Sequence, residues 1–261
     1  MKIEGKVALI TGASEGIGAA CAAEFARAGA RLSLTARSAE GLARTAAQAG
    51  GPSALVTAGD LTDEATRHAV MARTMERFGA VDILINNAGV GVYGPSWAVP
   101  MEQVRQMVEL NYFALLGMLQ LAVPHMRARR SGTIVNVGSI GGKVTLPWMT
   151  LYSSTKFAIG SLTEGLRMEL RADGVHAMLV CPGYVTTGFQ KNVLAGAAPP
   201  LVVRARRFAI TAGECARAIR RGVERDARTV MAPSSGWLMV ALRRLLPGIV
   251  EGRMAEMNRT E

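Results

Sequence analysis

Residues that form disulfide bonds or bind metals are scarce in this sequence of 261 residues, which contains three cysteines and three histidines. Cys21, Cys181 and Cys215 are odd in number and far apart, whereas metal sites and disulfide frameworks need closely spaced or paired ligands. We therefore expect three reduced thiols and no metal site. The sequence also lacks repeats, low-complexity tracts and Pro/Ser-rich linkers that would divide it into separate domains.

Acidic residues are in the minority: 20 Asp and Glu stand against 30 Lys and Arg, giving a formal net charge of +10. Such a balance can indicate a nucleic-acid partner, but here the basic residues are scattered and do not alternate with aromatic ones. We therefore expect no nucleic-acid partner. The segment Met1–Lys6 has no signal-peptide hydrophobic run before the first predicted strand, so we expect a cytoplasmic protein.

Hydrophobic residues make up 49% of the chain, which is enough for a sizeable core and too many for disorder. Short β-rich runs alternate with helical segments, which predicts an α/β fold with a parallel sheet in one domain over residues 1–261. The predicted strands are Val7–Ile10, Arg31–Thr35, Ala54–Thr57, Ile83–Ile85, Thr133–Val137, Ala177–Val180 and Thr229–Met231. The predicted helices span 17–28, 39–49, 63–78, 101–128, 152–172 and 213–225.

Tyr152 and Lys156 lie four residues apart at the start of a predicted helix, so their side chains share one helix face. An ammonium beside a phenol is expected to lower the pKa of the phenol from about 10 toward neutral. Such a pair can move a proton on and off an alcohol or carbonyl oxygen. Ser139, just after the predicted strand Thr133–Val137, is a third candidate. On its own, a Tyr-x-x-x-Lys pair is more often a solvated surface pair.

A glycine-rich turn, Thr11–Gly18, lies between the first predicted strand and a helical stretch. Glycines in this position let the backbone approach a pyrophosphate, whose charge is favoured by the N-terminus of the helix. An ordinary tight turn would account for one or two glycines, but not for Gly12, Gly16 and Gly18 at this spacing. The turn therefore predicts a dinucleotide site.

Six motifs together resemble the short-chain dehydrogenase/reductase family, in that family's order and spacing from about Gly5 to Ala232. They are Thr-Gly-x-x-x-Gly-Ile-Gly at 11–18, Asn86-Asn87-Ala88-Gly89, Asn111, Ser139, Tyr152-x-x-x-Lys156 and Pro182-Gly183. The resemblance implies a Rossmann-like, doubly wound fold of about seven parallel strands with helices on both faces. It also implies an oxidoreductase that transfers hydride between a nicotinamide and a carbonyl or alcohol.

By this resemblance Asn111, Ser139, Tyr152 and Lys156 are the catalytic residues. Tyr152 would deliver a proton to the substrate oxygen, Ser139 would donate a hydrogen bond to it, and Lys156 would hold the nicotinamide ribose and keep the pKa of Tyr152 low. Asn111 would bend its helix and hold a water that links Lys156 to solvent; a purely structural asparagine is the alternative. Thr155 replaces the serine common before the lysine, and we expect no consequence for function.

The predicted cofactor site comprises Gly12, Ser14, Glu15, Gly16, Ile17, Gly18, Arg37, Ser38, Asp60, Leu61, Asn87, Ala88, Gly89, Tyr152, Lys156, Pro182, Gly183, Val185 and Thr187. By resemblance, the carboxylate of Asp60 faces the adenine ring. The Val185 backbone and the Thr187 hydroxyl would meet the nicotinamide carboxamide. Asn86 is instead expected to tie the strand edge together.

The end of the second predicted strand bears on the choice of cofactor. Ala36 occupies the place where an NAD-preferring relative usually carries Asp, and Arg37 follows. A guanidinium can bind a 2′-phosphate through two parallel hydrogen bonds, and Ser38 can add a hydroxyl. Glu15 argues the other way, because many NADP-using relatives have Lys or Arg there. The sequence favours NADP(H) over NAD(H).

Substrate specificity is expected to come from loops. Residues 188–203 are mainly apolar and punctuated by Gly and Pro, which indicates a hydrophobic substrate loop over 188–212. Tyr93, Trp97, Trp148 and Met149 are expected to flank the cleft. These features favour an apolar small-molecule substrate, such as an acyl, steroid-like or aromatic ketone or alcohol.

An apolar C-terminal extension is predicted over 234–261. Its segment 236–250 is strongly apolar but contains Arg243 and Arg244, and it is too short to span a bilayer, which takes about 20 apolar residues. Three alternatives remain: a wall of the substrate pocket, which we favour, a subunit contact, or an interfacial helix that makes a peripheral membrane contact.

Two predicted helices, 101–128 and 152–172, carry more apolar residues than one core-facing stripe needs. Those residues are Leu115, Met118, Leu119, Leu162, Leu166 and Met168. This excess predicts a homo-oligomer, a tetramer ahead of a dimer, unless both faces pack within the subunit. The alternative function is a catalytically silent family member that senses cofactor or acts as a scaffold; the intact Ser139, Tyr152 and Lys156 argue against it.

Overall fold

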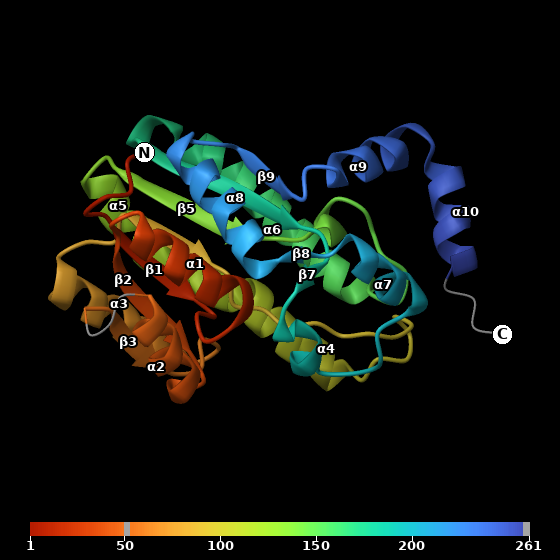
Figure 1. Ribbon diagram of the computed structural model, residues 1–261, viewed down its shortest axis with the longest axis horizontal. Coiled ribbons are helices and arrows are strands. Elements are labelled where there is room, and N and C mark those ends of the chain that lie inside the picture. The colour runs from red at the N-terminus through yellow and green to blue at the C-terminus, as the bar shows by residue number, and fades with distance from the viewer. Residues whose placement is uncertain (50–52, 258–261) are drawn as a thin grey trace.

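The computed structural model describes residues 1–49 and 53–257, and a parallel sheet of seven strands lies at its centre (Figure 1). The strands are β1 (Val7–Thr11), β2 (Arg31–Ala36), β3 (Leu55–Ala58), β4 (Ile83–Asn86), β5 (Gly132–Val137), β6 (Val175–Pro182) and β9 (Thr229–Ala232). Their order is β3-β2-β1-β4-β5-β6-β9, so β2 and β3 are added on one side of β1 and the later strands on the other, and the strand order reverses between β1 and β4. In such doubly wound sheets, ligands bind at this switch point, outside the carboxyl ends of the strands.

The helices that follow the strands are α1 (Gly16–Arg27), α2 (Ala39–Gln48), α3 (Glu64–Phe78), α4 (Met101–Val108), α5 (Leu115–Ala128), α6 (Thr150–Glu169), α7 (Pro200–Ala205), α8 (Ala212–Glu224), α9 (Gly236–Leu245) and α10 (Pro247–Met257). All seven predicted strands and all six predicted helices are present, with ends that differ by at most three residues. The predicted Rossmann-like α/β fold is confirmed. Residues 50–52 and the last four residues of the predicted extension, 258–261, lie outside the described residues.

Alternating side chains on the strands build two cores, one on each face of the sheet. In β1, Ala8 and Ile10 belong to a core that contains Phe25 of α1, whereas Leu9 belongs to a core that contains Met118 of α5. All five side chains are buried. Because successive side chains of a strand point to opposite faces, a sheet covered on both sides reads as a continuous apolar run.

The helix predicted over 101–128 is continuous but changes its pitch. α4 runs into a π-helical turn, Glu109–Ala114, and α5 follows. By length and composition the whole stretch Met101–Ala128 is apolar enough to cross a membrane, yet Met107, Met118 and Met126 are fully buried in the protein. These residues make the stretch part of the core, and 39% of its most apolar 18-residue window is buried.

The prediction that these two helices carry apolar surface beyond what the core needs is partly wrong. Leu115, Met118 and Leu119 are buried in the core between α5 and the sheet. Leu162 and Leu166 are partly buried and pack against the same core. The exposed large apolar side chains of these helices are Met101, Phe113, Phe157 and Met168.

A polar network fixes α6 to the sheet. Asn86 Nδ2 at the end of β4 donates to Asn136 Oδ1 on β5 at 3.0 Å, and Asn136 Nδ2 donates to Thr163 Oγ1 on α6 at 3.0 Å. All three residues are buried. The contact agrees with the prediction that Asn86 ties the strand edge, and it sets the position of the helix that carries Tyr152.

Residues 188–212 leave the sheet and return to it at a second, small sheet. β7 (Val185–Thr186) pairs in parallel with β8 (Ile210–Thr211), and the segment between them includes a 3₁₀ turn, Gly188–Asn192, and α7. The sequence did not predict β7, β8 or α7. α9 and α10 follow one another at a bend and extend away from the sheet at the end where α7 lies (Figure 1); we call the two together the C-terminal hairpin, although their axes cross and are not antiparallel.

Candidate active site

The glycine turn after β1 depends on close backbone contacts. Gly12 has φ +64°, and a Cβ there would lie 2.9 Å from the Ala88 Cα. A Cβ on Gly18 would lie 2.2 Å from the Gly12 carbonyl oxygen. Only glycine is compatible with this geometry, because a positive φ and such approaches exclude a side chain. The three elements that meet here are the turn, the start of α1 and the segment after β4.

Thr11 holds that segment in place and was missed by the sequence analysis. Its Oγ1 accepts from the Asn87 N–H at 2.9 Å and from the Ala88 N–H at 3.1 Å. Asn87 Nδ2 returns hydrogen bonds to the carbonyl oxygens of Thr11 at 3.0 Å and Gly12 at 3.1 Å. A threonine that ends a buried strand just before a glycine turn is the only sequence signal for this role.

A cavity of about 420 Å³ opens beside this turn at the switch point of the sheet. Its walls include the predicted cofactor residues Gly12, Ser14, Glu15, Gly16, Ile17, Arg37, Ser38, Asp60, Leu61, Asn87, Ala88, Gly89 and Thr187. Glu15 is the N-cap residue of α1, but its side chain makes no capping hydrogen bond. The first N–H groups of the helix are therefore free to donate to a bound anion. The cavity, the glycine cradle and the helix N-terminus fit a dinucleotide.

The far end of this cavity is basic. Arg37 follows β2, and Arg44 on α2, which the sequence analysis missed, lines the same cavity. Gly41 and Arg44 lie three residues apart and so share the helix face that borders the cavity, but neither was a predicted ligand, so this spacing gave no signal for Arg44 in the sequence. The predicted ligand Ser38 is the N-cap of α2 and accepts from the Gly41 N–H at 3.0 Å.

Asp60 also lies at this end. One of its carboxylate oxygens, Oδ1, accepts from both the amide and the hydroxyl of Thr62 at 2.9 Å each. Asp63 caps α3 by accepting from the Ala65 N–H, so Asp60 is not needed as the helix cap. This arrangement holds the Asp60 carboxylate at the cavity wall.

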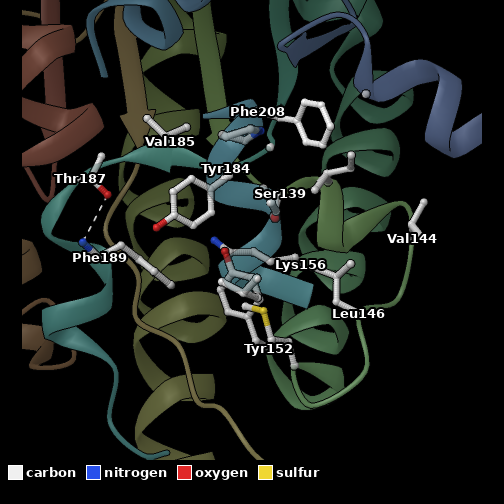
Figure 2. A pocket seen from close by; sticks show the side chains of 18 of the residues that line it. Ser139, Val144, Leu146, Tyr152, Lys156, Tyr184, Val185, Thr187, Phe189 and Phe208 are labelled. Atoms are coloured by element: carbon white, nitrogen blue, oxygen red, sulfur yellow. Dashed lines mark hydrogen bonds between the residues drawn. The ribbon is translucent and has the colours of Figure 1, made fainter. Parts of the chain in front are cut away.

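Glu15 reaches from the glycine turn to the substrate loop. Its Oε1 accepts from Asn192 Nδ2, and its carboxylate lies where a Cβ on Gly188 would be. The 3₁₀ turn Gly188–Asn192 is thereby joined to the N-terminus of α1. Thr187 begins that turn by accepting from the Phe189 N–H at 3.2 Å (Figure 2).

A second cavity, of about 370 Å³, adjoins the first and shares Ile17, Asn87, Gly89, Thr187 and Phe189 with it. The predicted residues Pro182, Gly183 and Val185 line it. Gly18 lines neither cavity and is buried under the turn, where it lets α1 approach Gly12.

Ser139, Tyr152 and Lys156 all line the second cavity, although they come from the end of β5 and from α6 (Figure 2). Ser139 is the N-cap of the short 3₁₀ turn Ile140–Gly142, and its Oγ accepts from the Gly141 N–H at 3.0 Å. Because the Gly141 N–H occupies one lone pair of Oγ, the Ser139 hydroxyl proton points away from that amide. The Ser139 hydroxyl hydrogen-bonds the Tyr152 side chain. This hydrogen bond lowers the pKa of the Tyr152 phenol, but burial raises it by more.

Burial dominates the electrostatics of this pair. Tyr152 and Lys156 are 8% and 5% exposed. Loss of water raises the pKa of Tyr152 far above its ordinary value and lowers the pKa of Lys156 to about 8. The prediction that Lys156 lowers the pKa of Tyr152 is therefore wrong for this arrangement. Lys156 Nζ lies over the Tyr152 ring, 5.6 Å from its centroid, and donates to the Val137 carbonyl at 3.0 Å.

Asn111 is fully buried within the π-helical turn. Its side chain accepts from the Val90 N–H at 2.9 Å, donates to the Val90 carbonyl at 2.9 Å and donates to Thr155 Oγ1 at 3.2 Å. Thr155 donates in turn to the Tyr152 carbonyl at 2.8 Å. Thr155, for which we expected no role, therefore links Asn111 to the backbone of Tyr152.

The rest of the second cavity is apolar. Val144, Leu146, Met149, Leu201, Val202 and Phe208 line it. Tyr93 and Met149 flank it as predicted, but Trp97 and Trp148 do not. Trp97 is 87% exposed on the surface, and Trp148 has φ +60°, a backbone turn that the sequence pattern does not reveal.

One polar cluster interrupts the apolar wall. Gln190 Nε2 donates to the Tyr184 hydroxyl at 3.0 Å, and Arg206 donates to Gln190 Oε1. Gln190 also hydrogen-bonds Tyr93. Tyr184 and Phe189 stand across the cavity from Tyr152 and Lys156 (Figure 2), and the Phe189 and Tyr152 rings meet edge to face at 5.7 Å.

The C-terminal hairpin closes one side of the cavity. Gly236 and Met239 of α9 and Met254 of α10 are among its lining residues. Of the three alternatives for the extension, the structure therefore supports the pocket wall for these inward-facing residues. The outward-facing residues of α9 and α10, such as Leu238, Leu245 and Ile249, are exposed to solvent.

Comparisons with known proteins agree with this geometry. Residues 6–198 match the sequence profile of the family described as short chain dehydrogenase. The Dehydrogenase/reductase SDR family protein 7-like of Anopheles gambiae is 31% identical over an alignment of 275 residues, which covers 99% of this chain and 86% of the relative.

Solved structures show the same fold. A short chain dehydrogenase/reductase from Burkholderia phymatum in complex with NAD has a TM-score of 0.86 at 28% identity, covering 100% of this chain and 98% of that chain. A short-chain dehydrogenase from Sphingobium yanoikuyae in complex with NADPH has a TM-score of 0.78 at 30% identity, covering 98% of both chains. The protein therefore belongs to the short-chain dehydrogenase family of nicotinamide-dependent oxidoreductases.

Proposed function

We propose that the protein is an NADP(H)-dependent oxidoreductase that interconverts apolar carbonyl compounds and alcohols. The observation that carries the proposal is the position of Ser139, Tyr152 and Lys156. They form a polar group in a cavity whose remaining wall is mainly apolar apart from the Gln190–Tyr184 cluster, and this cavity adjoins the one at the glycine turn. A bound nicotinamide would supply the hydride.

Ser139 and Tyr152 would handle the substrate oxygen. Ser139 Oγ accepts from the Gly141 N–H, and its proton, which hydrogen-bonds the Tyr152 side chain in the free protein, would be donated to a bound carbonyl oxygen and position it. The raised pKa of Tyr152 keeps the phenol protonated at neutral pH, which suits a donor that delivers a proton as negative charge develops on that oxygen. These properties support the reductive direction.

Lys156 would hold the nicotinamide ribose, and its charge would act on Tyr152 across the face of the phenol ring. Its amine has a pKa of about 8 and lies over the Tyr152 ring, so a modest change in its surroundings alters its charge near neutral pH. Asn111 would act as a positioning residue, because it links the segment after β4 to Thr155 and hence to the helix that carries both side chains.

Arg37 and Arg44 support the choice of NADP(H). Both line the basic end of the first cavity, where a guanidinium can bind a phosphate bidentately. Ala36 brings no carboxylate that would repel it. Glu15, which argued for NAD(H) in the sequence, is engaged with Asn192 of the substrate loop. That contact gives Glu15 another role.

The test is turnover with a panel of ketones and quinones, using NADPH. We expect activity with apolar ketones, and we expect Tyr152→Phe to lower kcat by about 10²–10⁴-fold while NADPH still binds, since only the proton donor is lost. If Tyr152→Phe kept more than about a tenth of kcat, the role of Tyr152 would be wrong. NADPH binding without turnover of any substrate would favour the silent, cofactor-sensing alternative.

A further inference from the structure

The outer face of the C-terminal hairpin is apolar and uncovered. α9 contains no buried residue. We call the exposed apolar side chains of this hairpin the docking surface: Trp237, Leu238, Leu242, Leu245, Leu246 and Ile249. Leu238, Leu242 and Leu245 follow the i, i+4, i+7 spacing of one helix stripe, and Leu245 is 76% exposed. Exposed apolar patches of this kind usually mark an interaction site.

A second apolar and basic segment lies beside the hairpin. α10 contacts α7, and Phe208, which follows α7, is 65% exposed while also lining the second cavity. Met239 of α9 is likewise 37% exposed and lines the same cavity. The docking surface therefore lies next to the cavity, at the end of the molecule where the hairpin extends from the sheet (Figure 1).

The loop beside the docking surface and α9 itself carry basic residues and no acidic ones, whereas α10 carries Glu251 and Glu256. The stretch 188–212 contains Lys191, Arg204, Arg206 and Arg207 and no acidic residue, and the stretch 233–250 contains Arg243 and Arg244 and no acidic residue. Arg243 is neutralised by Glu251 of α10 at 2.7 Å. Across residues 1–49 and 53–257, Arg204, Arg207 and Arg244 have no acidic partner within ion-pair distance.

We propose that the docking surface binds the surface of an anionic lipid bilayer, with the apolar side chains at the level of the headgroups and the arginines on the phosphates. Trp237 and Arg244 lie seven residues apart, on one stripe of α9, where an amphipathic ring and a cation both suit the membrane boundary. A two-fold contact between copies would instead place like charges against each other, which is unfavourable.

Membrane contact would place the cavity next to the phase in which apolar compounds dissolve. Met239 and Phe208 would form a continuous apolar path from the bilayer to Ser139 and Tyr152. This consequence rests on the proposed function. The binding itself does not, so the two can fail separately.

The experiment is co-sedimentation of the full chain with vesicles of phosphatidylcholine alone and of phosphatidylcholine mixed with phosphatidylserine. We expect binding to the anionic vesicles only, reversed by salt. The double variant Arg207→Gln/Arg244→Gln should lower the partition coefficient roughly 25-fold, at about fivefold for each arginine. The matched control Arg73→Gln/Arg171→Gln removes two exposed arginines outside the docking surface and should bind as the unsubstituted protein does.

A second variant tests the apolar part. Leu245→Glu/Ile249→Glu should abolish binding to anionic vesicles while turnover of a small, water-soluble ketone stays unchanged. The proposal would be overturned by absence of the folded, unsubstituted protein from the anionic vesicle pellet, or by equal binding to neutral vesicles. It would also be overturned if light scattering showed that the docking surface pairs two copies, with dissociation in Leu245→Glu/Ile249→Glu.

Discussion

Tyr152 and Lys156 are polar residues whose properties are set by loss of water. The pKa of Lys156 falls from 10.5 to about 8, because burial removes water from the ammonium and the hydrogen bond to the Val137 carbonyl replaces part of that hydration. The Tyr152 phenolate is disfavoured for the same reason. Their spacing in the sequence predicts that the two side chains lie close together. Their solvent exposure, however, is set by the packing of α6 on the sheet.

Lys156→Met should therefore stabilise the protein at neutral pH. A drop in pKa from 10.5 to about 8 corresponds to about 3 kcal/mol, from which loss of the hydrogen bond to Val137 takes about 1 kcal/mol. Between pH 8 and 10.5 the unfolded lysine holds a proton that the folded one has lost, so unsubstituted protein gains stability as pH rises through this window. The advantage of Lys156→Met should shrink over the same window.

Urea unfolding of both proteins from pH 7 to pH 10 measures this difference. Lys156→Arg, which keeps a charge that does not titrate, is the matched control and should show no such shrinkage. A difference in unfolding free energy that stays constant with pH would contradict the buried, titrating lysine.

Arg37 and Arg44 differ in whether the sequence alone predicts them as cofactor ligands. Arg37 could be predicted because it follows β2, where the family pattern places the cofactor determinant. Arg44 could not, because its position depends on the orientation of α2 after the capped turn at Ser38. The same limit explains Trp97 and Trp148, whose aromatic character indicated the cleft but which do not line it: Trp97 is exposed on the surface, and Trp148 has a positive φ.

Arg37→Ala should raise KM for NADPH about 10–150-fold, since a charge-assisted hydrogen bond contributes about 1.5–3 kcal/mol, and should leave KM for NADH nearly unchanged. Arg44→Ala should act in the same direction but more weakly, because Arg44 also pairs with Glu40. Steady-state kinetics with both cofactors provides the measurement. Equal kcat/KM for NADPH and NADH in the unsubstituted protein would defeat the proposed preference.

At the scale of elements, the sheet and its helices follow from the sequence, because strand and helix periodicities are local. The strands Val7–Thr11 and Gly132–Val137 are buried at every position, and all their residues except Thr11, Thr133 and Asn136 are apolar or glycine. The π-helical turn Glu109–Ala114 and the β7–β8 pair are different. Each is held by contacts between distant segments, such as Val185 with Ile210, and has no local periodicity to detect.

Asn111 makes the π-helical turn energetically important. Asn111→Leu should lower the free energy of unfolding by about 2–4 kcal/mol, because it leaves the buried N–H and carbonyl of Val90 without partners. Thr155→Val removes only the hydroxyl contacts and should cost about 1 kcal/mol, whereas Thr155→Ser should be nearly neutral. Denaturant unfolding of the three variants gives these values. A neutral Asn111→Leu would show that the turn does not depend on this side chain.

At the scale of the molecule, apolar surface remains after the cores are formed. Phe113 on the π-helical turn is 50% exposed, Phe157 on α6 is 42% exposed and Met168 on α6 is 69% exposed. The sequence indicated these helices for a subunit contact but identified the wrong residues on α5, since hydrophobicity does not distinguish an inward face from an outward one. The π-helical turn contacts α6, so Phe113 and Phe157 belong to adjoining elements.

We predict a homo-oligomer, a tetramer ahead of a dimer, that buries Phe113 and Phe157 around a two-fold axis. Phe157→Glu should shift the protein to a smaller species, because a two-fold contact brings each introduced carboxylate close to its symmetry mate or to apolar surface, and either is unfavourable. Trp97→Glu is the matched control: Trp97 is the more exposed residue, at 87%, but lies outside these helices, and its substitution should leave the oligomer intact. Light scattering at micromolar concentration measures all three proteins. If the unsubstituted protein is a monomer there, the helices pack only within the subunit; if Trp97→Glu dissociates it instead, the contact lies on another face.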